Sequence, residues 1–278
     1  MQTLENARVL ITGAGSGLGR ACALAFAAQG ARIAVSDLRL DAAQETVAIL
    51  AAQGRDGLAL TLDVTSEDSF VAAAEAVRQQ WGGVDVLINN AGVATAGTVA
   101  ESPIKQWQWV LDINLLGCVR GVRAVAPLMQ AQQAGHIVNV ASFAGIANPP
   151  AMASYNAAKA AVISLSETLR FELFPHIGVS VVCPSFFKTD LVNSGRGQVS
   201  EQEQASAPQM MQIVQRLMDK ASVSAEDVAA DIVAAVRQNR FLVMSHADAR
   251  SQTRLKRLSP ELYFRMAQKA TAGFLRRK

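Results

Sequence analysis

The chain has 278 residues, of which 50% are hydrophobic and 18% are charged, and this composition indicates a globular protein able to bury a full core. No uninterrupted apolar stretch approaches the ~20 residues of a membrane span, and the short polar segment at residues 1–8 predicts no signal peptide. The net charge of +3 is unevenly distributed: residues 250–278 hold nine basic residues and one acidic residue, which leaves the remainder at −5.

The first predicted element is a buried strand at residues 8–12, an apolar run that stops at a glycine. The loop GAGSGLG follows at residues 13–19, and an alanine-rich helix continues to residue 29. Glycines let the backbone turn tightly and approach a pyrophosphate, which then lies on the helix N-terminus. This order of strand, loop and helix predicts a dinucleotide site, whereas a glycine cluster elsewhere would be a plain turn.

The second predicted strand, residues 32–36, ends at Asp37. A carboxylate at this position can accept hydrogen bonds from both ribose hydroxyls and repels a 2′-phosphate, so it favours NAD. Arg39 leaves NADP open, because its guanidinium could meet that phosphate. The alternative interpretation of Asp37 is a turn or helix-capping residue.

Strands and helices alternate through the rest of the chain. Nearly every strand is a continuous apolar run, which predicts a parallel sheet covered on both faces and therefore an α/β fold with a doubly wound sheet. Ser66 is a plausible N-cap for its helix. The further strands are expected at residues 57–62, 84–88, 136–141, 179–183 and 241–244, and the further helices at 41–53, 66–81, 103–133, 155–174 and 225–238.

Ligands of such sheets bind at the carboxyl ends of the strands. Six notable residues fall at those ends, and we expect them to line one site: Gly13, Asp37, Asp63, Asn89, Ser142 and Pro184.

Tyr155 and Lys159 lie four residues apart on one predicted helix, so both side chains project from the same face. A phenol has a reference pKa near 10, and an ammonium group one turn away is expected to lower it. If the fold brings Ser142 alongside, its hydroxyl can bond the same substrate oxygen. This set predicts proton transfer to or from an alcohol while another group moves a hydride.

The chain resembles the classical short-chain dehydrogenase/reductase family over about residues 7–244. The resemblance rests on the joint order of TGxxxGxG from Thr12, NNAG from Asn89, Asn114, Ser142, YxxxK from Tyr155 and PSxxxT from Pro184. It implies one Rossmann-type domain with about seven strands, here residues 1–249, and a nicotinamide cofactor. The usual glycine after the proline is Ser185 here, a departure that removes no catalytic group.

The resemblance also implies roles for individual residues. Tyr155 would be the general acid/base, Lys159 would lower its pKa and hold the nicotinamide ribose, and Ser142 would orient the substrate oxygen. Asn114 would hold a water in a proton relay. Asn90 would brace the sheet. The cofactor would contact Gly13, Ser16, Gly17, Leu18, Gly19, Asp37, Asp63, Val64, Asn89, Ala91, Gly92, Tyr155, Lys159, Pro184, Phe187 and Thr189.

The substrate side is expected to hold the apolar loop at residues 148–152 and a helical lid at about 190–224. The methionine-rich stripe in residues 210–218 predicts either a lid for an apolar substrate or a helix packed on the core. Because no carboxylate or phosphate clamp is evident, a hydrophobic secondary alcohol or ketone is the expected substrate.

Residues 250–278 form a basic extension in which Leu255, Leu258, Leu262 and Met266 recur at helical spacing. The pattern predicts one amphipathic helix, with its leucines packed on the body or on a second subunit. Peripheral membrane contact is the less favoured alternative. Nucleic-acid binding is not expected, since the body is acidic and no recognition motif occurs.

The predicted function is an NAD(P)-dependent oxidoreductase, a homodimer or homotetramer in the cytoplasm. A dinucleotide-sensing regulator without catalysis is the alternative, although such a protein should lack part of the Ser142, Tyr155 and Lys159 set.

No metal site is expected, because the cysteines and histidines lie far apart, and the cysteines have apolar neighbours typical of buried, reduced thiols. These residues are Cys22, Cys118, Cys183, His136, His176 and His246.

Overall fold

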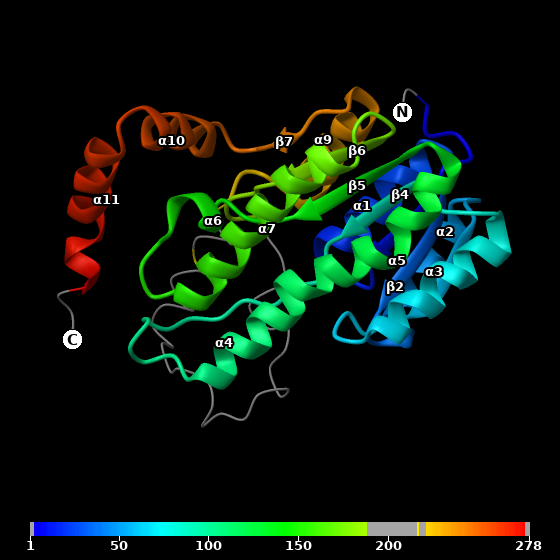
Figure 1. The fold of residues 1–278 in the computed structure, drawn as a ribbon, viewed down its shortest axis with the longest axis horizontal. Coiled ribbons are helices and arrows are strands. Elements are labelled where there is room, and N and C mark those ends of the chain that lie inside the picture. Colours follow the sequence, from blue (N-terminus) through cyan, green and yellow to red (C-terminus); the bar gives the residue numbers. More distant parts are fainter. Residues whose placement is uncertain (1–2, 188–215, 217–220, 276–278) are drawn as a thin grey trace.

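The computed structural model describes residues 3–187, 216 and 221–275. Helices surround a central sheet, and a pair of helices stands at one end (Figure 1). The strands are β1 (Arg8–Thr12), β2 (Arg32–Asp37), β3 (Gly57–Thr61), β4 (Val86–Asn89), β5 (Gly135–Val140), β6 (Ile177–Val182) and β7 (Leu242–Val243). The helices are α1 (Gly17–Ala28), α2 (Leu40–Ala52), α3 (Glu67–Trp81), α4 (Ile104–Leu111), η1 (Asp112–Leu116), α5 (Gly117–Gln132), α6 (Ala144–Ala147), α7 (Ala153–Glu172), α9 (Ala225–Gln238), α10 (Ala247–Leu258) and α11 (Pro260–Leu275).

The seven strands of the described residues form one sheet in the order β3-β2-β1-β4-β5-β6-β7. Every pairing is parallel. The chain winds outward from β1 in one direction and from β4 in the other, so the strand order reverses between these two strands. The predicted doubly wound, Rossmann-type α/β fold is confirmed. Such a reversal opens a crevice at the carboxyl ends of the strands.

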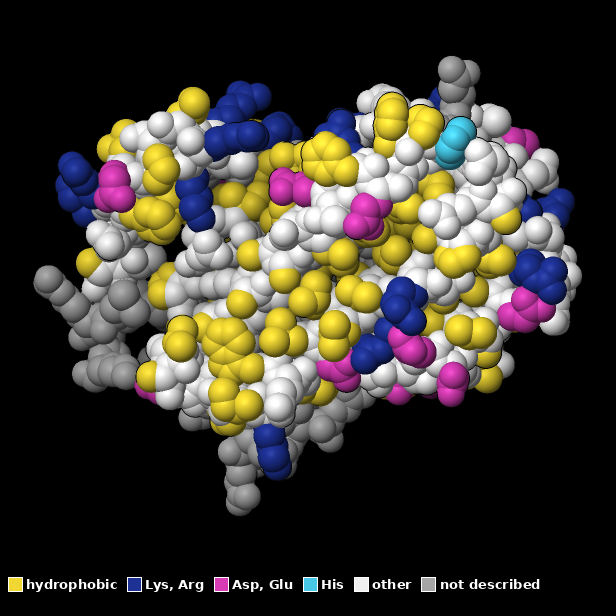
Figure 2. Space-filling model, in the orientation of Figure 1, with side chains coloured by type: hydrophobic (Ala, Val, Ile, Leu, Met, Phe, Trp, Pro, Cys, Tyr) yellow, Lys and Arg dark blue, Asp and Glu magenta, His cyan; other side chains and the backbone are white. Residues whose placement is uncertain are grey.

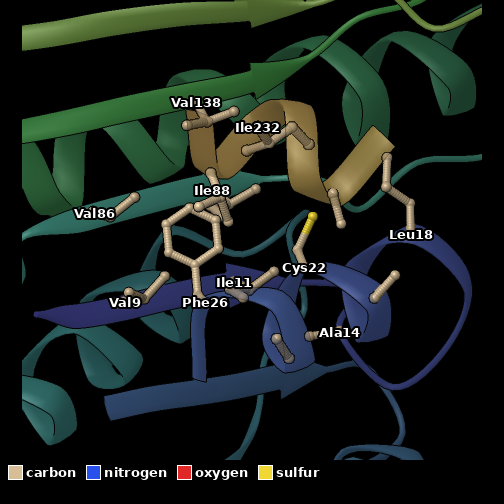
Figure 3. Packing of buried hydrophobic residues seen from close by; sticks show 14 of the residues in the cluster. Val9, Ile11, Ala14, Leu18, Cys22, Phe26, Val86, Ile88, Val138 and Ile232 are labelled. Atoms are coloured by element: carbon tan, nitrogen blue, oxygen red, sulfur yellow. The ribbon is translucent and has the colours of Figure 1, made fainter. Parts of the chain in front are cut away.

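Successive residues of the central strands point to opposite faces of the sheet, and each face has its own core. Val9 and Ile11 pack with α1 and α9, including Phe26 and Ile232, as Figure 3 shows. Leu10 lies on the other face, in a cluster with side chains of α3, α5 and α7. Since both faces are covered, the strands are mostly apolar, which is the pattern that made them predictable.

The helices α3 and α9 each begin with a serine whose side chain caps the N-terminus. Ser66 accepts a hydrogen bond from Ser69 N at the start of α3, as predicted. Ser224 and Asp227 form a reciprocal capping box at the start of α9. Each cap satisfies backbone N–H groups that have no partner within the helix.

The helix predicted over residues 103–133 is continuous but not regular. Its middle turn, η1, is a π-helix that contains Asn114. The buried Asn114 amide is paired with the backbone of Val93, donating to its oxygen (2.9 Å) and accepting from its nitrogen (2.8 Å). π-turns commonly mark functional sites, because the extra residue redirects side chains.

The C-terminal extension corrects a prediction. Instead of one amphipathic helix, two helices meet at Ser259, whose backbone is not helical (φ −147°, ψ 78°) and which precedes Pro260. Proline disfavours the α conformation in the residue before it and supplies no N–H, so the helix ends and a new one starts. Leu258 and Leu262 are 85% and 48% exposed and do not pack on the body, whereas Tyr263 is only 6% exposed.

The surface of this extension carries both basic and hydrophobic side chains (Figure 2). Within the described residues, no helix combines the length and the hydropathy needed to cross a membrane. The expected lid at residues 190–224 lies almost wholly outside the described residues, as do the methionine stripe and the terminal Arg276, Arg277 and Lys278.

Candidate active site

A large cleft runs along the carboxyl ends of the strands, with a volume of about 1630 Å³. Pockets for single small ligands usually measure roughly 300–1,000 Å³, so this cleft is large enough for a dinucleotide and a second molecule. Residues after β1, β2, β3, β4, β5 and β6 all contribute to its lining. The sheet therefore delivers the end of each of these strands to one site.

The loop after β1 packs tightly against the end of β4. Gly13 has φ +63°, and a Cβ there would lie 2.9 Å from Ala91 Cα. The Asn90 amide donates to the carbonyl oxygens of Thr12 (2.9 Å) and Gly13 (3.0 Å). The Thr12 hydroxyl accepts from the backbone nitrogens of Asn90 and Ala91, both at 3.0 Å. Asn90 therefore joins the end of β4 to the loop after β1.

The N-terminus of α1 opens onto the cleft. Ser16 is the N-cap residue and makes no side-chain capping bond, and Ser16, Gly17 and Leu18 line the cleft. First-turn N–H groups have no partner within a helix, so they suit a phosphate.

Asp37, the last residue of β2, lies beside the same loop. Its carboxylate accepts hydrogen bonds from the backbone nitrogens of Gly15 (3.0 Å) and Arg39 (3.1 Å). A Cβ on Gly15 would lie 2.8 Å from that carboxylate, so only glycine fits beside it. The glycine loop, the uncapped helix terminus and this carboxylate form a cradle with the donors and acceptors that a dinucleotide requires.

Tyr155 and Ser142 meet in the cleft, from the start of α7 and the end of β5. Burial raises the pKa of Tyr155 to about 12, and a side-chain hydrogen bond with Ser142 acts in the opposite direction. The Ser142 hydroxyl also accepts from Ala144 N (3.1 Å), which fixes its position. The phenol is therefore protonated at neutral pH and lies against a second hydroxyl group.

Lys159 lies one turn further along α7 and is only 4% exposed. Its ammonium nitrogen donates to Val140 O (2.8 Å) and lies 5.8 Å from the centre of the Tyr155 ring. Burial lowers the pKa of Lys159. The predicted lowering of the Tyr155 pKa by Lys159 is wrong for this structure, because the desolvation of the buried phenol dominates.

Asn114 does not line the cleft but lies directly behind it. A Cβ on Gly92 would lie 3.1 Å from Asn114 Oδ1 and 3.5 Å from Lys159 Nζ. Gly92 thus separates the two side chains, and its lack of a side chain lets both approach the same point.

Most residues predicted to hold a cofactor do line the cleft. These are Gly13, Ser16, Gly17, Leu18, Asp37, Asp63, Val64, Ala91, Gly92, Tyr155, Lys159, Pro184 and Phe187.

Two of the residues predicted to contact the cofactor, Asn89 and Gly19, do not line the cleft. Asn89 is buried beneath the cleft, where its amide donates to Asn139 Oδ1 (2.9 Å) between β4 and β5. Gly19 is on the inner side of α1, where a Cβ would lie 2.2 Å from Gly13 O. Both residues support the loop and strands and do not line the cleft. Thr189 lies outside the described residues.

The three thiols are buried and free, as expected. Burial raises their pKa values, to about 12 for Cys22 and Cys183 and about 11 for Cys118. The described residues contain no group of histidine, cysteine or carboxylate side chains that could hold a metal ion.

Sequence reasoning missed one wall of the cleft. Residues of α10 and α11 line it together with the expected loop at residues 148–152. The aromatic pair Tyr263 and Phe264, within an otherwise polar and basic segment, was the available signal. The contributing residues are Asp248, Gln252, Tyr263, Phe264, Ala267, Gln268, Ala270 and Thr271.

Comparison with known proteins agrees with this architecture. The family profile described as short chain dehydrogenase matches residues 7–200. A short chain dehydrogenase/reductase from Burkholderia phymatum, solved in complex with NAD, is 35% identical with a TM-score of 0.88, covering 94% of this chain and 96% of that chain.

Two curated relatives match nearly the whole chain. The CLA biosynthesis dehydrogenase/reductase of Lactiplantibacillus plantarum is 30% identical over 260 residues, covering 89% of this chain and 91% of the relative. SadH of Mycobacterium tuberculosis, named as an oxidoreductase, is 33% identical over 277 residues, covering 99% and 98%.

The sheet and its cleft define a Rossmann-type α/β protein. Within that class, the chain belongs to the short-chain dehydrogenase/reductase family, and the predicted family is confirmed.

Proposed function

We propose that this protein is an NAD-dependent oxidoreductase that interconverts a secondary alcohol and a ketone. The observation that carries the proposal is the meeting of Tyr155 and Ser142 at the end of β5, with the buried Lys159 one helical turn behind. A nicotinamide dinucleotide, when bound, supplies or accepts the hydride at C4 of its ring.

Tyr155 is the general acid/base. In the reducing direction its phenol donates a proton to the oxygen of the carbonyl as hydride arrives at the carbon, and in the oxidising direction the phenolate accepts that proton. The raised pKa keeps the phenol protonated at neutral pH, which suits proton donation. Ser142 positions the same oxygen through a second hydrogen bond.

Lys159 positions α7 against β5 and holds a positive charge beside the phenol ring. A nearby cation stabilises the phenolate that proton donation leaves behind. Lys159 would also hold the nicotinamide ribose. Asn114, which faces Lys159 across Gly92, would hold a water that returns protons from solvent.

The glycine loop and the N-terminus of α1 would bind the pyrophosphate, and Asp37 would accept hydrogen bonds from the adenosine ribose. A carboxylate at this point favours NAD over NADP. The exposed Arg39 next to it would moderate that preference. Asp63 and Val64 would contact the adenine, and Thr189 the nicotinamide carboxamide.

The test is a screen of secondary alcohols and ketones with NAD(H) and NADP(H), followed by the near-ultraviolet absorbance of the reduced nicotinamide. Turnover that disappears in Tyr155→Phe is the expected result. Tight dinucleotide binding without turnover of any alcohol or ketone would instead favour the alternative function, a dinucleotide-sensing regulator without catalysis.

We also propose that the protein forms a homodimer or homotetramer through α4, α5 and α7. Ile104 of α4, Phe171 of α7 and Leu116 of η1, which joins α4 to α5, are exposed hydrophobic residues. Exposed apolar groups of this kind often mark an interface. Light scattering of the purified protein measures the assembly directly, and a monomer at all concentrations would contradict the proposal.

A further inference from the structure

Helix α11 presents one continuous face to the cleft. Tyr263, Phe264, Ala267, Gln268 and Thr271 all line it. Their spacing of one, three, one and three residues places them on one side of an α-helix. Leu262, which precedes this set, and the intervening Arg265, Met266 and Lys269 are exposed and do not line the cleft.

Two polar contacts fix this helix to the segment that follows Ser142. The Lys256 ammonium donates to Ile146 O, and the Tyr263 hydroxyl donates to Ala147 O at 3.1 Å. These oxygens belong to the last residues of α6 and have no partner within that short helix. The negative end of a helix also favours a cation such as Lys256.

A third contact joins the extension to the loop after β6. His246, the residue before α10, accepts a hydrogen bond from Ser185 N (3.2 Å) at Nδ1, and its Nε2 lies 3.0 Å from Phe186 O. Nε2 therefore carries the proton that bonds this carbonyl. The extension is thus attached at α6 and at the β6 loop, two segments that flank Tyr155 in the cleft.

The side chains of this wall that line the cleft are apolar or uncharged polar groups with one carboxylate, and none of them is a cation. Lys256 lies 5.3 Å from the centre of the Phe264 ring but does not line the cleft, and it donates to Ile146 O. Phe264, Ala267 and Ala270 line the cleft along with Pro149 and Pro150. Among the described lining residues, the only Lys or Arg side chains are those of Arg39, beside Asp37, and Lys159, which bonds Val140. The carboxylate of Asp248 would further disfavour an anionic substrate.

We propose that α11 is the outer wall of the substrate pocket and selects elongated, uncharged, mainly hydrophobic alcohols or ketones. The reactive carbon lies at Tyr155, and the hydrocarbon chain passes Pro149 and Pro150 to contact Phe264 and Ala267. This inference rests on the proposed function, and it assigns Phe264, Ala267 and Ala270 as specificity-determining residues.

The test uses a homologous series of alkan-2-ols from butan-2-ol to decan-2-ol. In the unaltered protein, kcat/KM should rise by about threefold to fourfold for each methylene group that becomes buried. Ala267→Phe places a large side chain on the pocket face and should lower kcat/KM for decan-2-ol by roughly tenfold or more, equivalent to about two buried methylenes. Its kcat/KM for butan-2-ol should be unchanged.

Met266→Phe is the matched control, because it introduces the same side chain one position away, on the face that does not line the cleft. Ala270→Phe repeats the test should Ala267→Phe not fold. The inference would be overturned if kcat/KM depended on the chain length of the alcohol in the same way in the control and in the pocket-face variants. It would also be overturned if kcat/KM of the unaltered protein did not depend on chain length.

Failure of the proposed function would be seen separately, as no turnover of any alcohol or ketone with either cofactor. The role of α11 as a pocket wall would then be tested by equilibrium binding of the uncharged apolar dye Nile red. Weaker binding to Ala267→Phe than to Met266→Phe supports the wall, and equal binding to both contradicts it.

Discussion

Lys159 Nζ donates a 2.8 Å hydrogen bond to the carbonyl oxygen of Val140, and this bond ties α7 to the end of the strand that leads to Ser142. Tyr155, the proposed general acid/base, lies on α7, and Ser142, which positions the substrate oxygen, follows β5. Because the lysine is buried, the bond exists away from competing water and holds the two elements in register.

Lys159→Met should therefore affect both stability and function. The substitution keeps the length of the side chain but leaves Val140 O without its donor, which costs about 1–3 kcal/mol when the acceptor is buried. Turnover and dinucleotide affinity should both fall. Urea unfolding and cofactor titration measure the two effects, and wild-type turnover in this variant would refute the role assigned to Lys159.

Tyr155→Phe should separate binding from chemistry. The ring remains packed, so dinucleotide affinity and thermal stability should be retained, while turnover falls by the roughly 10²–10⁴-fold typical of a lost acid/base group. Since the pKa of Tyr155 is raised to about 12, the rate of ketone reduction in the unaltered protein should not fall through mildly alkaline pH from loss of this proton. Unchanged turnover in Tyr155→Phe would end the mechanism as stated.

The parts that the sequence predicted well are those governed by local patterns. The buried strands could be recognised because both faces of the sheet are covered, and Ser66 could be recognised as a cap from its position before a helix. That Asp37, Asp63 and Ser142 lie at one edge of the sheet followed from the direction of the strands.

The parts that it missed depend on contacts distant in sequence. Nothing local indicates that Asn89 bonds Asn139 beneath the cleft, or that Lys256 and Tyr263 reach α6 across more than a hundred residues. The direction of the Tyr155 pKa shift also required the structure, because burial outweighs the neighbouring charge. Pro260 was visible in the sequence and should have ended the predicted helix.

Asp37 should make NAD the preferred cofactor. Charge-assisted hydrogen bonds contribute about 1.5–3 kcal/mol each, so the preference should be roughly tenfold or more. Asp37→Ala should reduce the ratio of NAD affinity to NADP affinity, and Arg39→Ala should increase that ratio. Calorimetric titration of both dinucleotides provides the measurement; tighter NADP binding by the unaltered protein would show that Arg39 dominates.

His136 should make the protein sensitive to acid. It is buried and bonded to Ser180 Oγ at 2.8 Å, and burial lowers its pKa from 6.5 to about 3. Between these values the unfolded state binds more protons than the folded state. The free energy of unfolding should therefore fall as the pH drops from about 6.5 toward 3, by up to ~1.4 kcal/mol per pH unit from this group.

His136→Gln should remove this contribution and flatten the dependence of stability on pH. The exposed His176 provides the control, because His176→Gln should leave the slope unchanged. Denaturant unfolding at a series of pH values tests both variants, and identical slopes in all three proteins would rule out His136 as the sensitive group.

The docking of the extension should depend on Lys256 and Tyr263 and not on the exposed Leu258 and Leu262. Tyr263→Phe deletes only the hydroxyl that donates to Ala147 O, and Lys256→Met keeps the methylenes but removes the donor to Ile146 O. Each should lower stability by about 0.5–1.5 kcal/mol, the usual net contribution of a hydrogen bond, and should speed chymotrypsin cleavage within α10 and α11. Leu262→Ala removes an exposed side chain of the same helix and should change neither quantity. Faster cleavage and lower stability in Leu262→Ala would contradict this prediction. That result would indicate that Leu262 holds the extension in place by packing on a second subunit.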